Sequence, residues 1–353
     1  MSELETEKNS VTIKSNTDIS TYHAPQCEQL ANDLYRLSVF YPHTKNYVNT
    51  YLIHTPERSL LIDSGSRDDE SFFSLDYLLN YLAVDRSKLE VFITHLHSDH
   101  IGGVERLWKP GMRVYAGVPN LLQHREENRK RFETFFPLLK RFEAKQGKHI
   151  EALRDLKAAS YCVNTDIETV CLSDGDSLCV GDYRFRVLHT PGHERHELCL
   201  WEEEKGLLFS GDAIIHKLYS NMYPIDFECD EVEEYFQSIR RLKTLPVNTV
   251  FAGHKDPMNR DALTEACEDA IAHHKRRMND VLRVISRGHH ELAEITYYFT
   301  YQGKRRHWED YPVAFHWTLM VEMAAYLRHL LAKNKVELHQ TTSGCIFTLA
   351  DVF

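Results

Sequence analysis

The sequence of 353 residues carries a formal net charge of −10, which argues against a surface coated by nucleic acid but leaves a local basic groove open. Its 42% hydrophobic and 27% charged residues are ordinary for a globular protein, and the eight cysteines include no C-x-x-C pair. Because the N-terminus is polar and no stretch approaches the roughly 18–20 apolar residues that cross a bilayer, we expect a cytoplasmic protein without a membrane partner.

Short strand-like runs separated by turn residues follow a polar lead-in, residues 1–32. Their composition predicts a meandering sheet, and the last of them ends in Asp63-Ser64-Gly65. Apolar residues at helical spacing predict a helix over 71–82. The strand-like runs are 34–42, 47–55 and 59–65.

Residues 119–160 are rich in charge and carry apolar side chains at helical spacing, which predicts two or three amphipathic helices inserted between strands. A structural cover for the sheet and a lid over a functional site are the two interpretations of this insertion. Strands resume after it, followed by a helix predicted over 230–243 and a strand ending at His254.

From about residue 259 the pattern predicts three helices and then a hairpin around Ser343-Gly344, which is the order of a winged-helix module. Residues 264–353 hold 11 Lys and Arg against 11 Asp and Glu, so no net basic surface supports nucleic-acid binding there. Core packing and a homodimer contact remain the two interpretations of this region.

Potential metal ligands gather in the stretch 91–103, VFITHLHSDHIGG. His95 and His97 follow an apolar run at i, i+2 spacing, so their side chains are expected to point the same way. Asp99 and His100 would face a second direction. Such a cluster could hold two metal ions side by side.

Four further segments place a lone ligand-type residue beside a small or turn residue where a strand ends. Each one alone is a weak signal, because Gly-His or Gly-Asp after a strand is usually a turn. Together with the histidine-rich stretch they predict a metal site, since imidazole and carboxylate suit Zn²⁺ and two such ions can share a bridging carboxylate. The four residues are Asp63, His193, Asp212 and His254.

These motifs resemble those of the metallo-β-lactamase-fold hydrolase superfamily over roughly residues 34–258, and the tail resembles the winged-helix tail of its lactamase-β-like, glyoxalase II-like subgroup. The resemblance implies an α/β fold, an αββα sandwich over 33–258 with the helical insertion at 119–160, and a helical, winged-helix-like C-terminal domain over 259–353. The motifs are Asp63, THLHSDH at 94–100, TPGH at 190–193, SGDA at 210–213 and AGH at 252–254.

The resemblance also implies a role for each ligand-type residue. His95, His97 and His193 would surround a first metal ion. A second ion would bind Asp99, His100 and His254, with Asp212 as the bridge. Asp63 would fix the ligand loop through hydrogen bonds, and Asp99 would orient the nucleophile or relay a proton. The implied cofactor is two Zn²⁺ per chain, with Fe or Mn as alternatives.

We therefore expect a metal-dependent hydrolase whose dinuclear-zinc-bound hydroxide cleaves a small-molecule ester, thioester or lactone. An RNA or nucleotide phosphodiesterase on the same metal site is the alternative. A diiron redox protein is disfavoured because its relatives usually carry a carboxylate where His97 stands, and a non-catalytic binding protein is disfavoured because every ligand position is intact.

Substrate contacts are expected from side chains near the ligand loops in sequence. His196, His216, Tyr219 and Tyr223 are the candidates for a polar contact. The phenylalanines of the insertion suggest a contact with an apolar acyl or ring portion; they are Phe132, Phe135, Phe136 and Phe142.

Overall fold

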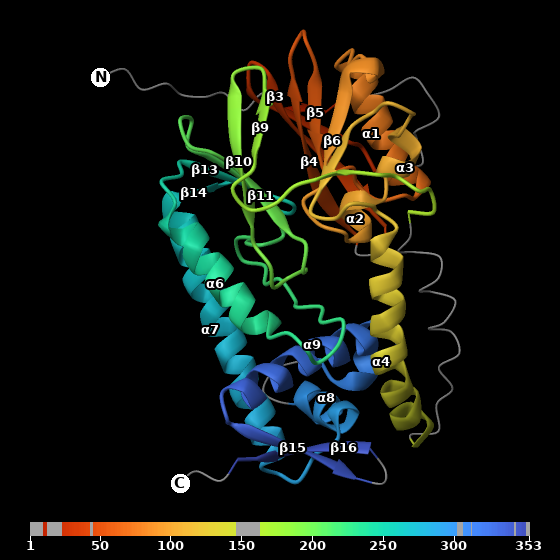
Figure 1. Cartoon of the computed structure of the whole chain (residues 1–353), viewed down its shortest axis with the longest axis vertical. Helices are drawn as coiled ribbons and strands as arrows, with labels where there is room; N and C mark the ends of the chain where they lie inside the picture. The colour runs from red at the N-terminus through yellow and green to blue at the C-terminus, as the bar shows by residue number, and fades with distance from the viewer. Residues whose placement is uncertain are drawn as a thin grey trace.

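Two β-sheets lie face to face with helices on their outer sides in a computed structural model, which describes residues 10–12, 23–42, 45–145, 163–301, 306–311, 313–341 and 344–350 (Figure 1). The first sheet has eight strands in chain order: β1 (Ser10–Thr12), β2 (Gln26–Ala31), β3 (Leu34–Tyr41), β4 (Asn46–His54), β5 (Ser59–Ile62), β6 (Leu89–Phe92), β7 (Val114–Ala116) and β8 (Val170–Cys171). Part of the predicted lead-in, β1 and β2, thus extends this sheet by pairing with β3.

The second sheet has six strands, in the order β14 (Met258–Asn259), β13 (Thr249–Ala252), β12 (Leu207–Gly211), β11 (Leu198–Glu202), β10 (Tyr183–His189) and β9 (Ser177–Val180). Aromatic rings fill the space between the two sheets, where Tyr51 of β4 meets Phe209 of β12 and Phe251 of β13. The predicted αββα sandwich is therefore confirmed.

The direction of the strands decides where the ligand residues meet. β5 and β6 are parallel, and so are β12 and β13. β10 is antiparallel to β11, which is antiparallel to β12, so β10 and β12 run the same way. The carboxyl ends of these strands therefore lie together at one edge of their sheet, where ligands commonly bind in folds of this kind.

The outer face of the first sheet is covered by α1 (Asp69–Tyr81), α2 (Ser98–Ile101) and α3 (Val104–Leu107). The 3-10 turn η2 (Arg86–Lys88), which has no buried residue, leads into β6. The N-cap residue Asp68 accepts a hydrogen bond from the Ser71 backbone N–H, which starts α1. Helices α6 (Glu231–Thr244) and α7 (Arg260–Ile285) cover the second sheet, with Asp230 and Asn259 as their N-caps. The helices predicted over 71–82 and 230–243 are confirmed to within two residues.

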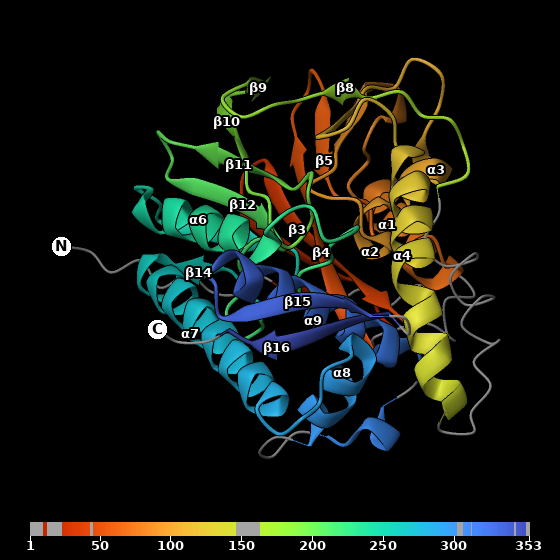
Figure 2. The same ribbon diagram turned by 60° about the horizontal axis from the view of Figure 1, so that its bottom comes forward.

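The C-terminal region contains the three predicted helices and hairpin. After α7 come α8 (Leu292–Thr300), the 3-10 turn η3 (Trp308–Asp310), α9 (Val313–Ala332) and the hairpin β15 (Val336–Thr341) with β16 (Gly344–Leu349). This region lies at the end of the molecule away from most of the two sheets, and α7 connects the two parts (Figures 1 and 2). No helix of the described part of the chain is long and apolar enough to span a membrane.

The insertion begins with one 23-residue helix, α4 (Gln123–Lys145). Its predicted remainder over 146–160 lies outside the described residues, so the number of helices in the insertion stays a prediction. Phe135 is fully buried and packs near Trp317 of α9, while Phe142 packs near Trp308. Phe132 and Phe136 are partly buried against the same core. These contacts hold α4 on the C-terminal helices. Both interpretations of the whole insertion, a cover for the sheet and a lid, stay predictions.

Candidate metal centre

Each candidate ligand lies in the segment that follows a strand, which explains how segments far apart in sequence meet. His95, His97, Asp99 and His100 follow β6 and run into α2. His193 follows β10, Asp212 follows β12 and His254 follows β13. Since these strands end at the same edge of the sandwich, their ligand residues face one another across the gap between the sheets.

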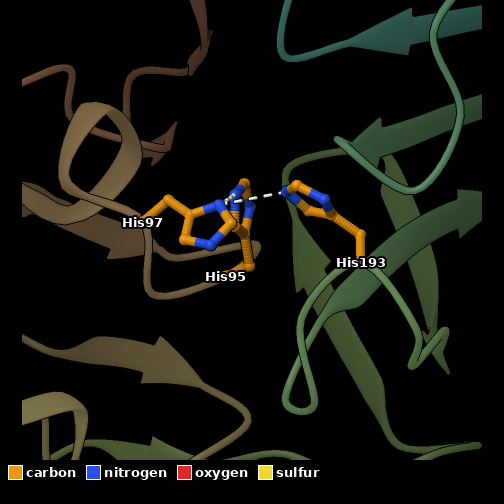
Figure 3. A group of neighbouring side chains, drawn as sticks. All are labelled: His95, His97 and His193. Atoms are coloured by element: carbon orange, nitrogen blue, oxygen red, sulfur yellow. Dashed lines mark hydrogen bonds between the residues drawn. The ribbon is translucent and has the colours of Figure 1, made fainter. Parts of the chain in front are cut away.

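Three imidazoles converge on one point from both sheets (Figure 3). His95 Nε2 and His193 Nε2 each lie 3.0 Å from His97 Nδ1. Three ring nitrogens at this separation cannot all donate to one another, because a neutral imidazole has one donor and one acceptor nitrogen. The arrangement therefore calls for a shared proton or a cation at its centre.

The outer nitrogens of two of these rings are fixed by neighbouring groups. His193 Nδ1 donates to the Asn221 carbonyl at 2.6 Å. His95 Nδ1 lies 3.0 Å from Thr94 Oγ1, which itself donates to Asp63 and so accepts from the histidine. Both rings consequently direct the Nε2 lone pair toward the centre of the group, as histidine ligands of metals require.

The second group consists of Asp99, His100 and His254. His254 donates from Nδ1 to the Tyr47 carbonyl at 3.1 Å, and its Nε2 lies 3.5 Å from Asp99 Oδ2. His100 donates from Nδ1 to Asp63 Oδ2 at 2.7 Å, which leaves its Nε2 lone pair facing the group. Asp63, with a φ of 61°, turns back behind His100 and Thr94 and belongs to neither group.

Asp212 lies between the two groups. Its Oδ2 is 3.4 Å from His254 Nε2 and 3.9 Å from His193 Nε2, while its Oδ1 is 3.6 Å from His100 Nε2. Gly253 gives the carboxylate room, because a Cβ at that position would lie 2.5 Å from Asp212 Oδ1. Glu197, fully buried, accepts the Asp212 backbone N–H at 2.8 Å and so holds the strand end in place.

A divalent cation fits this donor set. His100 Nε2 and Asp212 Oδ1 are both buried, and neither has a hydrogen-bond partner among the residues that the structure describes. With Nδ1 of His100 committed as a donor to Asp63, the neutral ring presents Nε2 as an acceptor beside the Asp212 carboxylate, and a cation between these two atoms would satisfy both. Neutral imidazoles with carboxylates are ligands typical of zinc, and iron or manganese also accept them.

The pKa directions divide the residues into two sets. Burial, followed by the neighbouring histidines, lowers the pKa of His95 and His97 well below the ordinary value, which keeps both rings neutral. Burial opposes charge on His254, but Asp212 and Asp99 outweigh it and raise the pKa of His254 to about 10. Burial likewise opposes ionisation of Asp99, but His100 and His254 lower its pKa to about 2. The carboxylates thus attract a positive charge, which a metal ion would supply in place of a proton.

The candidate substrate contacts divide by position. Tyr223 lies beside the first group of ligands, where the centroid of its ring is 4.9 Å from that of the His97 ring and 5.8 Å from that of the His193 ring. Tyr219 stacks on His273 of α7 at 3.8 Å, and His216 lies 3.6 Å from Glu265 of the same helix. His196 pairs with Glu127 of α4 at 2.8 Å. Their contact with a substrate stays a prediction.

Sequence reasoning did not single out the residues that orient the ligands. Glu197 is the last residue of TPGHERHE, four residues after the predicted ligand His193, where an acidic residue near a metal motif was the available signal. Asn221 acts through its backbone carbonyl, which no side-chain pattern reveals. Arg131 lies in a helix whose many charges predict a solvated surface, yet it is buried.

Comparison with known proteins gives a family model and several relatives. Residues 43–254 match the family model described as the metallo-beta-lactamase superfamily. The beta-lactamase-like protein 2 homolog of Caenorhabditis elegans is 22% identical over 256 residues, covering 72% of this chain and 70% of that protein. The acyl-coenzyme A thioesterase MBLAC2 of Gallus gallus is 27% identical over 255 residues, covering 64% of this chain and 79% of that protein.

Solved structures show the same fold. A metallo-beta-lactamase family protein from Thermus thermophilus superimposes with a TM-score of 0.72 at 22% identity, covering 91% of this chain and all of that chain. The shared fold thus extends beyond the residues of the family model into the C-terminal helical region.

Proposed function

The chain belongs to the metallo-beta-lactamase superfamily and is a hydrolase of that fold, and we propose that it is a dinuclear zinc thioesterase acting on a small acyl thioester. The observation that carries this proposal is the convergence of seven ligand-type side chains into two groups joined by Asp212. The thioesterase name of a relative supports the choice of a thioester among the carbonyl esters.

Zinc ions held by His95, His97 and His193 and by Asp99, His100 and His254, with Asp212 shared, would lower the pKa of a bound water to about 7 and polarise the substrate carbonyl. Asp63 and Glu197 hold the donors in place before substrate arrives, through the bonds to His100 and to the Asp212 backbone. Such preorganisation of donors is a large part of enzymatic rate enhancement.

The chemistry of the leaving group also supports a thioester. Asp99 is a carboxylate beside the imidazoles of His100 and His254, so the one proton it could give to a leaving group is a proton that it first takes from the attacking water. A thiol with an ordinary pKa of about 8.5 departs as the thiolate near neutral pH. An alkoxide is far more basic and would need a proton donor.

The test compares acyl-coenzyme A thioesters with oxyesters of the same acyl group. The thiol released from the thioester is followed with a thiol-reactive dye, and the acid released from both substrates is followed by pH titration. His97→Ala removes a ligand of the first group. His54→Ala is the matched control, because His54 lies at the end of β4 away from the metal ligands and forms a hydrogen bond with Ser59. We expect His97→Ala to lower kcat/KM for the thioester by about 100-fold or more, and His54→Ala to change it little.

Equal rates on the thioester and its oxyester, or thioester cleavage that survives His97→Ala, would refute the proposal. Single-stranded RNA belongs in the same panel. Its cleavage, lost in His97→Ala and unaccompanied by thioester cleavage, would establish the phosphodiesterase alternative instead. Removing metal with a chelator and restoring zinc, iron or manganese separately identifies the metal that supports activity.

A further inference from the structure

A buried arginine on α4 reaches the loop that lies over the first group of ligands. Arg131 is 9% exposed. Its Nε donates to the Pro224 carbonyl at 3.0 Å and its Nη2 to the Tyr223 carbonyl at 2.9 Å, and Nη1 donates to Asn128. The guanidinium therefore clamps two consecutive peptide groups at once, which its planar fork of donors permits.

The clamped segment controls two of the three imidazoles in the first group. The Asn221 carbonyl accepts the proton of His193 Nδ1 at 2.6 Å. The Tyr223 ring lies edge-on against both His97 and His193. Movement of residues 221–224 would rotate His193 and remove the ring that packs against His97.

A second contact from the same face of α4 reaches the segment that carries His193. Glu127 is one helical turn before Arg131, and its carboxylate pairs at 2.8 Å with His196, three residues after His193. α4 thus contacts both the segment that carries His193 and the segment that orients it. A buried guanidinium is costly to desolvate, so its position indicates a contact with more than a packing role.

We propose that Arg131 is a positioning residue for the first zinc ion: by clamping the Tyr223 and Pro224 carbonyls it holds His193 and His97 in the geometry that binds the metal. The proposal rests on the zinc hydrolase function above and deepens it. It gives α4 the role of holding the first metal site in place, and it predicts that loss of Arg131 lowers the affinity for only one of the two zinc ions.

The exposed neighbour Arg129 provides the matched control. It is on the same helix and pairs with Glu126 and Glu133 on the solvent side. Arg129→Ala therefore removes an arginine, its charge and its ion pairs from α4 without touching the loop.

The experiment measures the two zinc dissociation constants of the full chain by competition with a chromophoric chelator, together with the visible absorption spectrum of the Co²⁺ form. Arg131→Ala should weaken the binding of one zinc ion by about 10- to 100-fold, as removal of groups that orient metal ligands does, and leave the affinity for the other ion unchanged. Arg131→Lys, which keeps the charge but cannot hold two carbonyls, should give an intermediate value. Arg129→Ala should match the wild type.

His97→Ala and His254→Ala assign the affected site, because each removes a ligand of one group. The Co²⁺ spectrum of Arg131→Ala should lose the contribution that His97→Ala loses. Wild-type affinity for both zinc ions in Arg131→Ala, with only a lower Tm, or equal weakening of both, would overturn the proposal. Where Arg131→Ala does not fold, Arg131→Lys decides by the same criteria.

The wild-type chain separates this proposal from the function on which it rests. Two bound zinc ions without thioester hydrolysis would refute the proposed substrate and leave the Arg131 comparison decisive. A wild-type chain that binds fewer than two zinc ions would overturn both proposals.

Discussion

Replacing Asp63 by asparagine should selectively weaken the second metal site by reversing the tautomer of His100. Asp63 is 2% exposed and accepts from the Thr94 backbone N–H at 2.8 Å and from His100 Nδ1 at 2.7 Å. Asparagine tolerates the positive φ of 61° at this position, so the backbone can keep its path.

The asparagine amide has only one favourable orientation. Its oxygen must face the Thr94 backbone N–H, because that donor cannot change. Its NH₂ group then faces His100 Nδ1, which becomes an acceptor and moves the ring proton to Nε2. That nitrogen is the one 3.6 Å from Asp212 Oδ1, and its lone pair is lost to a metal ion.

The magnitude follows from the charge-assisted hydrogen bond between His100 Nδ1 and Asp63, which the metal-binding tautomer of His100 cannot form in Asp63→Asn. A hydrogen bond to a charged group contributes about 1.5–3 kcal/mol. At about 1.4 kcal/mol per factor of ten, we expect zinc at the second site to bind roughly 10- to 150-fold more weakly in Asp63→Asn.

The assay is zinc competition with a chromophoric chelator, in which wild type and variant are compared at each binding step. Asp33→Asn is the matched control. Asp33 accepts a hydrogen bond of 2.7 Å from Tyr183 and contacts neither group of metal ligands. Unchanged affinity of the second zinc ion, or equal loss at both sites with an intact fold, would show that the tautomer argument is wrong.

Three further predictions concern the bridge, the core and pH. Gly253→Ala would place a Cβ 2.5 Å from Asp212 Oδ1, so the zinc affinity measured by chelator competition should fall about tenfold or more. Unchanged affinity would contradict the role of Asp212 as the ligand shared by the two metal sites. Phe135→Ala removes a fully buried ring between α4 and the C-terminal helices, so the free energy of unfolding measured by urea titration should fall by about 3–5 kcal/mol. A change below about 1 kcal/mol would show that the ring is not part of the core. Burial raises the pKa of Glu231 from 4.5 to about 7, so the folded chain binds this proton more tightly and its stabilising effect, present below about pH 4.5, is lost as the pH rises through about 7. The free energy of unfolding of Glu231→Gln, relative to that of the wild type, should therefore be up to about 3 kcal/mol higher at pH 8 than at pH 4. A difference that does not change with pH in urea titrations would refute the assignment.

Elements with strong periodicity were predictable from local sequence, and the exceptions have physical causes. α1 and α6 were predicted within two residues because each has a capping Asp and an apolar stripe. The insertion was predicted as two or three helices over 119–160; its described part is a single helix, α4, which continues through Pro137. A proline inside a helix costs about 3 kcal/mol. Phe135 and Leu139, both fully buried, flank it and anchor both sides to the core.

The sequence by itself determined the set of candidate ligands, because a ligand residue directly after a strand keeps its place relative to that strand in any structure where the strand forms. Only the tertiary structure decided which of the nearby side chains face the metal centre. Tyr219 turns to α7 and His196 to α4, while Tyr223 faces His97, although all three are close to ligand loops in sequence. Loop side chains take their direction from contacts with distant segments, such as the clamp of Arg131 on two carbonyls 92 and 93 positions further along the chain, and such contacts leave no local pattern.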